Sequence, residues 1–290
     1  MLARQFDEPI IDSSMIPTFL VSRLVRQNCT VALGGDGGDE LFGGYRHYSR
    51  LMWLYQHLGS VPLGFRRAFV NVIGSNLPIG FKGRNWLQAL DTDFRDDLPL
   101  IASYYDKKSR NRLLAKNLRN DGVAEEIRET RISKTDDLMQ RATRTDFDNY
   151  LPENILVKVD RSSMLNSLEL RSPMLDVHLI EFAFGKVPSH LKATATARKK
   201  LLKKLAVRLL PPEFDKNRKQ GFSIPLASWL QGGSWLNYFR EVLLDPSQDL
   251  FDHRFIQSLL DGQCKGRSNG ERLFGLIMFE LWRREYQVEL

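Results

Sequence analysis

The spacing of apolar residues along the chain predicts a mainly helical protein. Ile16, Phe19, Leu20 and Leu24 recur at helical spacing and predict a helix that continues to about Gln27. Before Pro17, the segment Asp12, Ser13 and Ser14 offers side chains that can cap this helix, and contact with a substrate is the alternative role. The same periodicity predicts further helices at residues 45–58, 63–73, 97–105, 107–118, 135–150, 154–167, 176–183, 197–210, 234–244, 253–262 and 269–285, with Pro152 interrupting the long segment.

A single strand stands out from this helical pattern. Thr30 to Leu33 form an unbroken β-branched and aliphatic run that glycines end, which predicts a short buried strand within residues 29–34. Strand signals beyond residues 29–34 are weak, and the irregular residues 74–96 are expected to be a surface excursion. Because a strand of this kind needs neighbours at both edges, its partners are expected from sequence upstream of this chain.

Size and composition indicate an ordinary globular protein. The 290 residues are 42% hydrophobic and 27% charged, and no apolar run approaches the 18 or so residues of a membrane span. The N-terminus MLARQFDEPI lacks the order of a secretory signal, so the expected location is the cytoplasm. Cys29 and Cys264 are interpreted as buried thiols rather than as a disulfide or zinc site.

The net charge of +7 raises the question of an anionic partner. The densest basic run is RKKLLKKLAVR at 198–208, in which Leu201, Leu202, Leu205 and Leu209 lie at helical spacing opposite the cations. A solvated helix face is the first interpretation, and phosphate contact is the second. Nucleic acid comes third because no aromatic residues are interleaved with the cations.

The most unusual stretch is VALGGDGGDELFGGY at residues 31–45, where Asp36, Asp39 and Glu40 follow the predicted strand among six glycines. The carboxyl ends of parallel strands are where ligands bind in open sheets, and glycines let the backbone approach a ligand. Taken alone, the run would also suit a tight turn with solvated acids before a helix. Glu40 in particular could cap that helix through its dipole.

Five motifs taken together carry a family resemblance. They are FDEPIIDSSMIPTFLVSRL at 6–24, VALGGDGGDELFGGY at 31–45, LPENILVKVDRSSM at 151–164, SLELRSPMLD at 167–176 and RKQGFSIPLASWL at 218–230. In this order they resemble the synthetase domain of glutamine-dependent asparagine synthetases. The resemblance implies an α/β fold of the Rossmann-like adenine nucleotide alpha hydrolase type, of which residues 1–290 would be a partial C-terminal domain, predominantly α-helical, with a remnant of the parallel sheet.

The resemblance also implies substrates and residue roles. Enzymes similar to this chain use ATP and Mg²⁺ to activate the side-chain carboxylate of aspartate as β-aspartyl-AMP, which ammonia then attacks. Asp39 matches the magnesium ligand, and Gly34 and Gly35 match the backbone beside the nucleotide, although the family often has serine where this chain has Gly34. Asp36 replaces an active-site glutamate with a shorter side chain, as a base or amine-positioning group. Lys219 matches a lysine that reaches the α-phosphate or the developing oxyanion.

Other charged residues have structural interpretations. Asp160, Arg161 and Arg171 belong to the matching motifs and are expected in buried ion pairs that fix the loops, with a functional role as the alternative. The five histidines are scattered, so no histidine metal site is expected: His47, His57, His178, His190 and His253.

Two elements of the family are missing from these residues. The serine-glycine-glycine-x-aspartate-serine pyrophosphate loop is absent, and Leu2 stands where an N-terminal cysteine nucleophile would be. We therefore expect the C-terminal part of a longer enzyme, with ammonia supplied by a glutaminase domain, and negligible turnover by this chain alone. The alternatives are a related amidotransferase acting on another carboxylate in polysaccharide or antibiotic assembly, and a non-catalytic helical binding module. The oligomeric state stays open, with a homodimer as one option, and no membrane partner is expected.

Overall fold

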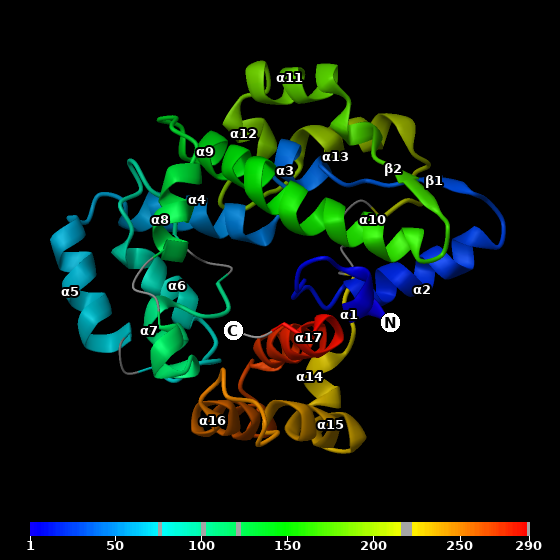
Figure 1. The fold of residues 1–290 in the computed structure, drawn as a ribbon. Helices are drawn as coiled ribbons and strands as arrows, with labels where there is room; N and C mark the ends of the chain where they lie inside the picture. The colour runs from blue at the N-terminus through cyan, green and yellow to red at the C-terminus, as the bar shows by residue number, and fades with distance from the viewer. Residues whose placement is uncertain (75–76, 100–102, 120–122, 216–221, 289–290) are drawn as a thin grey trace.

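The computed structural model describes residues 1–74, 77–99, 103–119, 123–215 and 222–288. Within these residues the chain is mostly helical and carries one small parallel sheet of two strands, in agreement with the expected helix-dominated fragment. Figure 1 shows the sheet at one side of the molecule and the C-terminal helices α14 to α17 gathered below it.

The sheet pairs two segments that lie far apart in the sequence. Strand β1 (Val31–Leu33) runs parallel to β2 (Glu169–Arg171), with Val31 opposite Glu169 and Leu33 opposite Arg171. The Gly34 N–H donates to the Arg171 carbonyl at 2.8 Å and continues the ladder past β1. The expectation that the partners of β1 come from sequence upstream of this chain was therefore wrong for this edge, because β2 lies within the chain. β2 escaped notice because three residues with an alternating polar pattern are too short for a recognisable strand signal.

The expected burial of β1 was also wrong. Val31 is 39% exposed and Leu33 is 73% exposed. Among the described residues β1 pairs only with β2, while α2 and α10 lie beside the sheet (Figure 1). One edge of β1 consequently has no strand on it within this part of the chain.

The first long helix forms where expected but buries a different face. Helix α2 (Met15–Arg26) buries Met15, Thr18 and Ser22, whereas Leu20 and Leu24 are 48% and 61% exposed. The expected side-chain cap is absent, because the Asp12 carboxylate instead accepts hydrogen bonds from the N–H and Oγ of Ser14.

Most other helices agree with the predicted ranges. They are α4 (Arg46–Leu58), α5 (Leu63–Ile73), α11 (Val177–Gly185), α13 (Lys200–Leu209), α15 (Ser234–Leu243), α16 (His253–Cys264) and α17 (Gly270–Tyr286). Shorter helices that were not anticipated include α1 (Leu2–Gln5), α3 (Gly38–Phe42), α8 (Val123–Arg131), α12 (Ser189–Lys192), α14 (Leu226–Trp229) and the 3-10 turn η5 (Pro173–Leu175).

Of two predicted helices around residue 105, the one at 97–105 was wrong in its described residues and the one at 107–118 was confirmed only in its first part. Residues 97–99 and 103–105 are not helical. The buried guanidinium of Arg141 donates hydrogen bonds to the backbone carbonyls of Phe94 and Asp97, so the Asp97 carbonyl is not engaged in a helix. The predicted helix 107–118 is divided into α7 (Lys107–Leu113) and the 3-10 turn η3 (Lys116–Leu118). Between them the Ala115 N–H donates to the Leu250 carbonyl at 2.8 Å, so tertiary pairing competes with helix continuation.

Pro152 does not interrupt its helix. Helix α9 (Leu138–Thr145) passes into a π-helical segment, η4 (Asp146–Leu156), and then directly into α10 (Val157–Met164). The π-helix hydrogen-bonds at i→i+5 rather than i→i+4, and this wider turn accommodates the proline that an α-helix would reject.

The described residues 77–96 contribute to the core, so the predicted surface excursion at 74–96 was wrong for them. They form α6 (Arg84–Gln88) and the 3-10 turn η2 (Ala89–Asp91). Ala89 and Phe94 are each 3% exposed and belong to a buried cluster with Tyr48, Leu51 and Met139. The sequence pattern did not predict this packing, because it comes from single apolar residues in turns and not from a repeating apolar pattern.

Two further findings concern composition. Cys29 is half-buried and Cys264 is exposed, so the interpretation of both as buried thiols was wrong for Cys264. Within the described residues, no helix has the length and apolar character to cross a membrane.

Candidate functional site

The acidic glycine loop lies at the carboxyl end of β1, as the sequence predicts. Strand β1 passes through Gly34 to Gly37 into helix α3, which carries Asp39 and Glu40 in its first turn. Gly37 has φ of +87°, and a Cβ there would lie 2.3 Å from Leu175 Cδ2. The turn therefore needs glycine for both its backbone conformation and its packing.

Asp39 pairs with the start of the basic run. Its Oδ1 lies 2.6 Å from Lys199 Nζ, and the neighbouring Arg198 donates to the Gly44 carbonyl at 3.1 Å. At the end of α13, Lys204 and Arg208 are exposed, as expected for a solvated face, but Leu205 and Leu209 are also exposed and do not form a buried side opposite them. The cations at its start, Arg198 and Lys199, instead lie against the acidic loop.

Asp36 occupies a partly buried position beside β2. Burial raises the pKa of its carboxyl, while the charge of Lys158 and a hydrogen bond from Ser172 oppose that rise. A Cβ added to Gly34 would lie 2.9 Å from Asp36 Oδ2. The carboxylate therefore occupies space that a side chain at position 34 would need.

Gly35 has open space around it. A Cβ added there meets no atom within 4 Å of the described protein. Gly35 is thus not required by packing, in contrast to Gly37, and room exists beside its backbone for a bound molecule.

Glu40 lies in the first turn of α3 but is buried rather than solvated. It is 1% exposed and accepts a hydrogen bond from the Tyr45 hydroxyl. Burial raises the pKa of Glu40, and the bond from Tyr45 opposes the rise. Nearby, Asp146 of the π-helical segment accepts from Tyr48 at 2.7 Å and lies 2.9 Å from His47 Nε2. His47 thus has an acidic partner that the sequence spacing did not reveal.

A lysine that we did not single out from the sequence lies in the same region. Lys158 of α10 donates to Asp12 Oδ2 at 2.8 Å and to Ser14 Oγ at 2.9 Å. Its only sequence signal was its place within the LPENILVKVDRSSM motif. The fold brings the Asp12 to Ser14 segment beside α10, which joins two of the five motifs.

The remaining predicted charges have different outcomes. Lys219 lies outside the described residues, so its predicted role remains a prediction. Arg161 pairs with Asp7, and Arg171 pairs with Glu169 at 2.7 Å, but both pairs are substantially exposed. The expectation of buried ion pairs was therefore wrong for these two arginines, because the side chains on this side of α10 and β2 are open to solvent.

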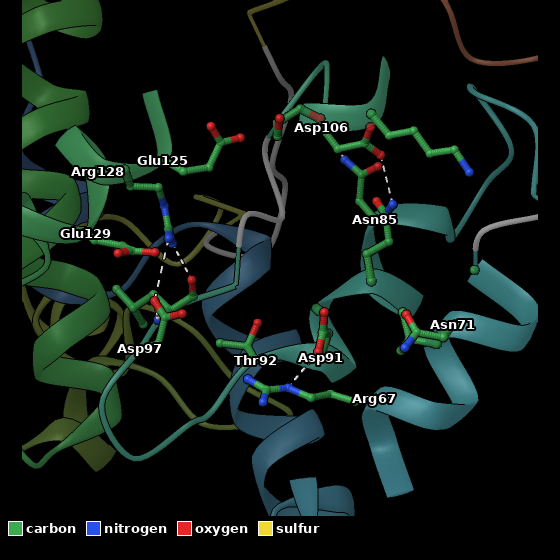
Figure 2. Close-up of a pocket in the computed structure, with 17 residues that line it drawn as sticks. Arg67, Asn71, Asn85, Asp91, Thr92, Asp97, Asp106, Glu125, Arg128 and Glu129 are labelled. Atoms are coloured by element: carbon green, nitrogen blue, oxygen red, sulfur yellow. Dashed lines mark hydrogen bonds and ion pairs between the residues drawn. The ribbon is translucent and has the colours of Figure 1, made fainter. Parts of the chain in front are cut away.

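A hollow lies elsewhere in the molecule, away from the acidic loop. A cavity of about 470 Å³ lies between α5, α6 and α8. Figure 2 shows several of the charged side chains that line it. Its charges compensate one another: Arg67 lies 3.0 Å from Asp91, and Arg128 lies 3.6 Å from Asp97. None of the five sequence motifs contributes to its lining. The chemistry of the sheet edge is thus separate from this cavity.

The fit of a magnesium ion depends on the available oxygen donors. Within the described residues, no group of three histidine, cysteine, aspartate or glutamate side chains is arranged to hold a metal. Mg²⁺ characteristically keeps one or two carboxylates and takes its other ligands from water and substrate phosphates. Asp39 fits such a shared site and would not by itself form an all-protein cage.

Comparison with known proteins identifies the family. The sequence profile described as asparagine synthase matches residues 2–284. The chain belongs to the asparagine synthase family. It is 28% identical over 283 residues to asparagine synthetase [glutamine-hydrolyzing] 1 of Bacillus subtilis strain 168, covering 96% of this chain and 44% of that protein.

Other members of the asparagine synthase family show the same relationship. A putative asparagine synthetase [glutamine-hydrolyzing] of Mycobacterium bovis is 30% identical over 285 residues, covering 95% of this chain and 42% of the relative. A second putative asparagine synthetase, from Methanocaldococcus jannaschii, is 35% identical over 173 residues, or 57% of this chain and 32% of the relative. The chain thus spans less than half the length of these relatives.

Proposed function

We propose that this chain is the C-terminal part of an ATP-dependent asparagine synthetase, which converts aspartate to asparagine through β-aspartyl-AMP with ammonia derived from glutamine. The observation that carries the proposal is the arrangement at the sheet edge, in a chain that belongs to the asparagine synthase family. There, Asp36 and Asp39 follow a parallel strand, and Lys158 and Lys199 supply positive charge beside them.

The two aspartates of the acidic loop, Asp36 and Asp39, would have different roles. Asp39 would hold Mg²⁺ jointly with the phosphates of ATP, and the bound nucleotide would supply the activated phosphorus. Lys199 neutralises the charge of Asp39, with 2.6 Å between Nζ and Oδ1. If a metal ion bound Asp39 in place of Lys199, the ammonium of Lys199 would be available to a phosphate oxygen. The backbone of Gly34 and Gly35 would lie against the nucleotide, where the open space beside Gly35 leaves room for it.

Asp36 would act in the amide-forming step. As the amine nitrogen attacks the acyl carbon, the carboxylate of Asp36 would accept the proton that nitrogen loses, and AMP would leave with the bonding electrons. Lys219 would stabilise the negative charge that develops on the phosphate or the acyl oxygen, a role suited to a compact ammonium.

We propose that residues 1–290 correspond to part of the synthetase domain and are insufficient for turnover alone. The pyrophosphate loop that holds the ATP phosphates in similar enzymes is absent from these residues. Incubation of the chain with ATP, aspartate, magnesium and ammonia is expected to give negligible asparagine. Robust asparagine formation by the isolated chain would overturn this part of the proposal.

A chimera tests the function itself. Residues 2–284 replace the matching segment of the Bacillus subtilis relative, and the chimera is expressed in an asparagine auxotroph. Growth without asparagine is expected for the wild-type chimera and not for chimeras carrying Asp39→Asn or Lys219→Met. A well-expressed chimera that forms no asparagine, or one that is indifferent to Asp39→Asn, would contradict the proposal.

A related amidotransferase acting on a different carboxylate is the second candidate. The observation that favours it is the Gly34 and Asp36 combination, in which the carboxylate occupies the space of a side chain at position 34. This rearranges the pocket wall relative to the serine and glutamate that the resemblance implies. Assay of the purified chimera against a panel of carboxylic acids, with pyrophosphate release as the readout, separates the two candidates.

A further inference from the structure

The ammonium of Lys199 contacts the carboxylate that the proposed function assigns to magnesium. Lys199 Nζ lies 2.6 Å from Asp39 Oδ1, and the two side chains are 34% and 26% exposed. The pair packs against Gly44, where an added Cβ would lie 1.6 Å from Asp39 Oδ1 and 2.2 Å from Lys199 Cε. The two charges therefore meet in a space that exists only because position 44 has no side chain.

The turn that precedes Lys199 is fixed to the acidic loop by a second contact. The Thr194 N–H donates to the Ala197 carbonyl at 2.8 Å, which closes the turn. Arg198 Nη1 then donates to the Gly44 carbonyl at 3.1 Å. Two successive cations thus hold the start of α13 against the end of the acidic loop.

The backbone of Lys199, the residue immediately before α13, has a left-handed conformation. Its φ is +50° and its ψ is +39°. Residues that carry a Cβ rarely adopt this conformation, and it persists where surrounding contacts hold the backbone. The contacts that hold it here are the ion pair with Asp39 and the hydrogen bond from Arg198 to Gly44. The fold therefore sets the position of this ammonium.

A divalent cation and Lys199 would compete for the Asp39 carboxylate. Lys199 Nζ contacts Oδ1, and a metal ion on either oxygen would lie close to that ammonium. Positive charges at such a separation repel one another. Asp39 is the acidic residue paired with Lys199 in the described part of the chain, so a metal ion that displaced the ammonium would leave it without a carboxylate.

We propose that Lys199 is a tethered counter-ion that competes with divalent metal ions for Asp39. The role of Asp39 as a metal ligand rests on the proposed function. A metal ion that binds alone must displace the ammonium, whereas a metal ion that binds with a polyphosphate brings an acceptor for it. Lys199 therefore lowers the affinity of Asp39 for the metal alone and couples metal binding to the binding of an anion.

Binding of Mn²⁺ alone to the 290-residue chain, measured by electron paramagnetic resonance, tests the competition without requiring turnover. Lys199→Met is expected to raise the affinity for Mn²⁺ by about three- to tenfold, the effect of removing an ion pair and a nearby like charge. Lys199→Arg keeps the charge and is expected to bind Mn²⁺ as weakly as wild type. Asp39→Asn should abolish the gain of Lys199→Met when the two substitutions are combined.

Lys200→Met is the matched control. It removes one positive charge from the next residue of the chain and leaves the ion pair between Lys199 and Asp39 in place. Its affinity for Mn²⁺ is expected to differ from wild type by less than about twofold, because solvent and salt screen a charge that does not contact the carboxylate. A gain as large as that of Lys199→Met would show that net charge, and not the ion pair, limits metal binding, and would overturn the proposal.

A second measurement uses the wild-type chain. The ¹³Cε resonance of Lys199 is expected to shift as Mg²⁺ is added, because the ammonium leaves the Asp39 carboxylate, and to lose this response in Asp39→Asn. With inorganic pyrophosphate present, the shift is expected at a lower concentration of free Mg²⁺, and equal midpoints would remove the coupling to an anion. The competition is overturned if folded Lys199→Met binds Mn²⁺ like wild type or, where that variant does not fold, if the Lys199 resonance does not respond to Mg²⁺.

The outcomes for Lys199 and for the proposed function are separable. Binding of Mn²⁺ that depends on Asp39 but not on Lys199, together with an active chimera, would remove only the competition. A higher affinity for Mn²⁺ in Lys199→Met, together with a chimera that forms no amide, would leave Lys199 as the competing cation and remove the proposed reaction. Binding that is indifferent to Asp39→Asn would remove both the metal role of Asp39 and the competition.

Discussion

Asp39 and Lys199 form an ion pair with 2.6 Å between Oδ1 and Nζ, although 160 positions of sequence separate them. The pair depends on the absence of a side chain at Gly44. A Cβ there would lie 1.6 Å from Asp39 Oδ1 and 2.2 Å from Lys199 Cε. The glycine-rich loop thus leaves room for an ion pair as well as for a ligand.

Gly44→Ala is therefore expected to displace both charged side chains. Overpacking at such a site typically costs about 1–3 kcal/mol of unfolding free energy, which urea denaturation would measure. Gly35→Ala is the matched control from the same loop, because a Cβ there meets nothing within 4 Å. Equal stability of the two variants would show that the ion pair does not have the packing described here.

We expect the hydrogen bond between Tyr45 and Glu40 to stabilise the protein by an amount that depends on pH. Burial raises the pKa of Glu40, so its contribution to stability is complete below the unfolded pKa and is lost as pH rises through the folded pKa. Tyr45→Phe removes the hydrogen bond that opposes the rise and should lower the unfolding free energy by about 1–3 kcal/mol at neutral pH, and by less near pH 4.

Urea denaturation of Tyr45→Phe at both pH values checks this expectation. Tyr55→Phe provides the control, since Tyr55 is 46% exposed and its substitution should have little effect at either pH. A Tyr45→Phe penalty that is the same at both pH values would contradict the assigned role of Glu40.

For Asp106, we expect the opposite pH dependence of stability, with the loss of stability at acidic pH. Burial alone would raise its pKa, but hydrogen bonds from Gln88 and Ser109 and the charge of Arg84 lower it to about 2. Its stabilising effect is therefore present above the unfolded value of 3.8 and is lost as pH falls toward 2. Asp106→Asn should cost on the order of 2 kcal/mol at pH 6, and the difference from wild type should shrink below pH 4. A pH-independent difference in denaturation midpoints would refute this linkage.

Gly34 and Asp36 are expected to be energetically coupled. A side chain at position 34 must displace Asp36 Oδ2, which lies 2.9 Å from the Cβ position. Because that oxygen ends a short flexible side chain, Gly34→Ser should fold but turn Asp36 away from Ser172. A double-mutant cycle with Asp36→Ala should give a coupling energy of about 0.5–3 kcal/mol by thermal denaturation. Additive effects would show that the two positions are independent.

The open edge of β1 predicts self-association of the isolated chain. Leu33 is 73% exposed beside a strand edge that no described residue pairs, and such edges recruit other strands. Leu33→Lys should therefore lower the weight-average mass in sedimentation experiments at high concentration. Val72→Lys is the control, because Val72 is 71% exposed on α5, which Figure 1 shows at the opposite side from β1. If the control lowers association equally, the strand edge is not responsible.

Local pattern was sufficient to predict much of the helical architecture. The ranges of α4 and α5 agree closely with the apolar periodicity of the sequence, because each of these helices packs one apolar stripe against the core. The strand before the acidic loop was also predictable, since β-branched residues followed by glycines define it locally. The motifs likewise indicated the family to which the chain belongs.

The sequence by itself determined the elements that short-range periodicity and turn chemistry specify, together with the acidic loop after β1. Only the tertiary structure decided that β2 pairs with β1, that Pro152 lies inside a continuous helix, that Lys158 pairs with Asp12, and that Lys199 pairs with Asp39 of the loop. The physical reason is that each of these features depends on partners distant in sequence. Which cation pairs with a carboxylate, and which strand pairs with another, is decided only when folding brings distant segments of the chain together.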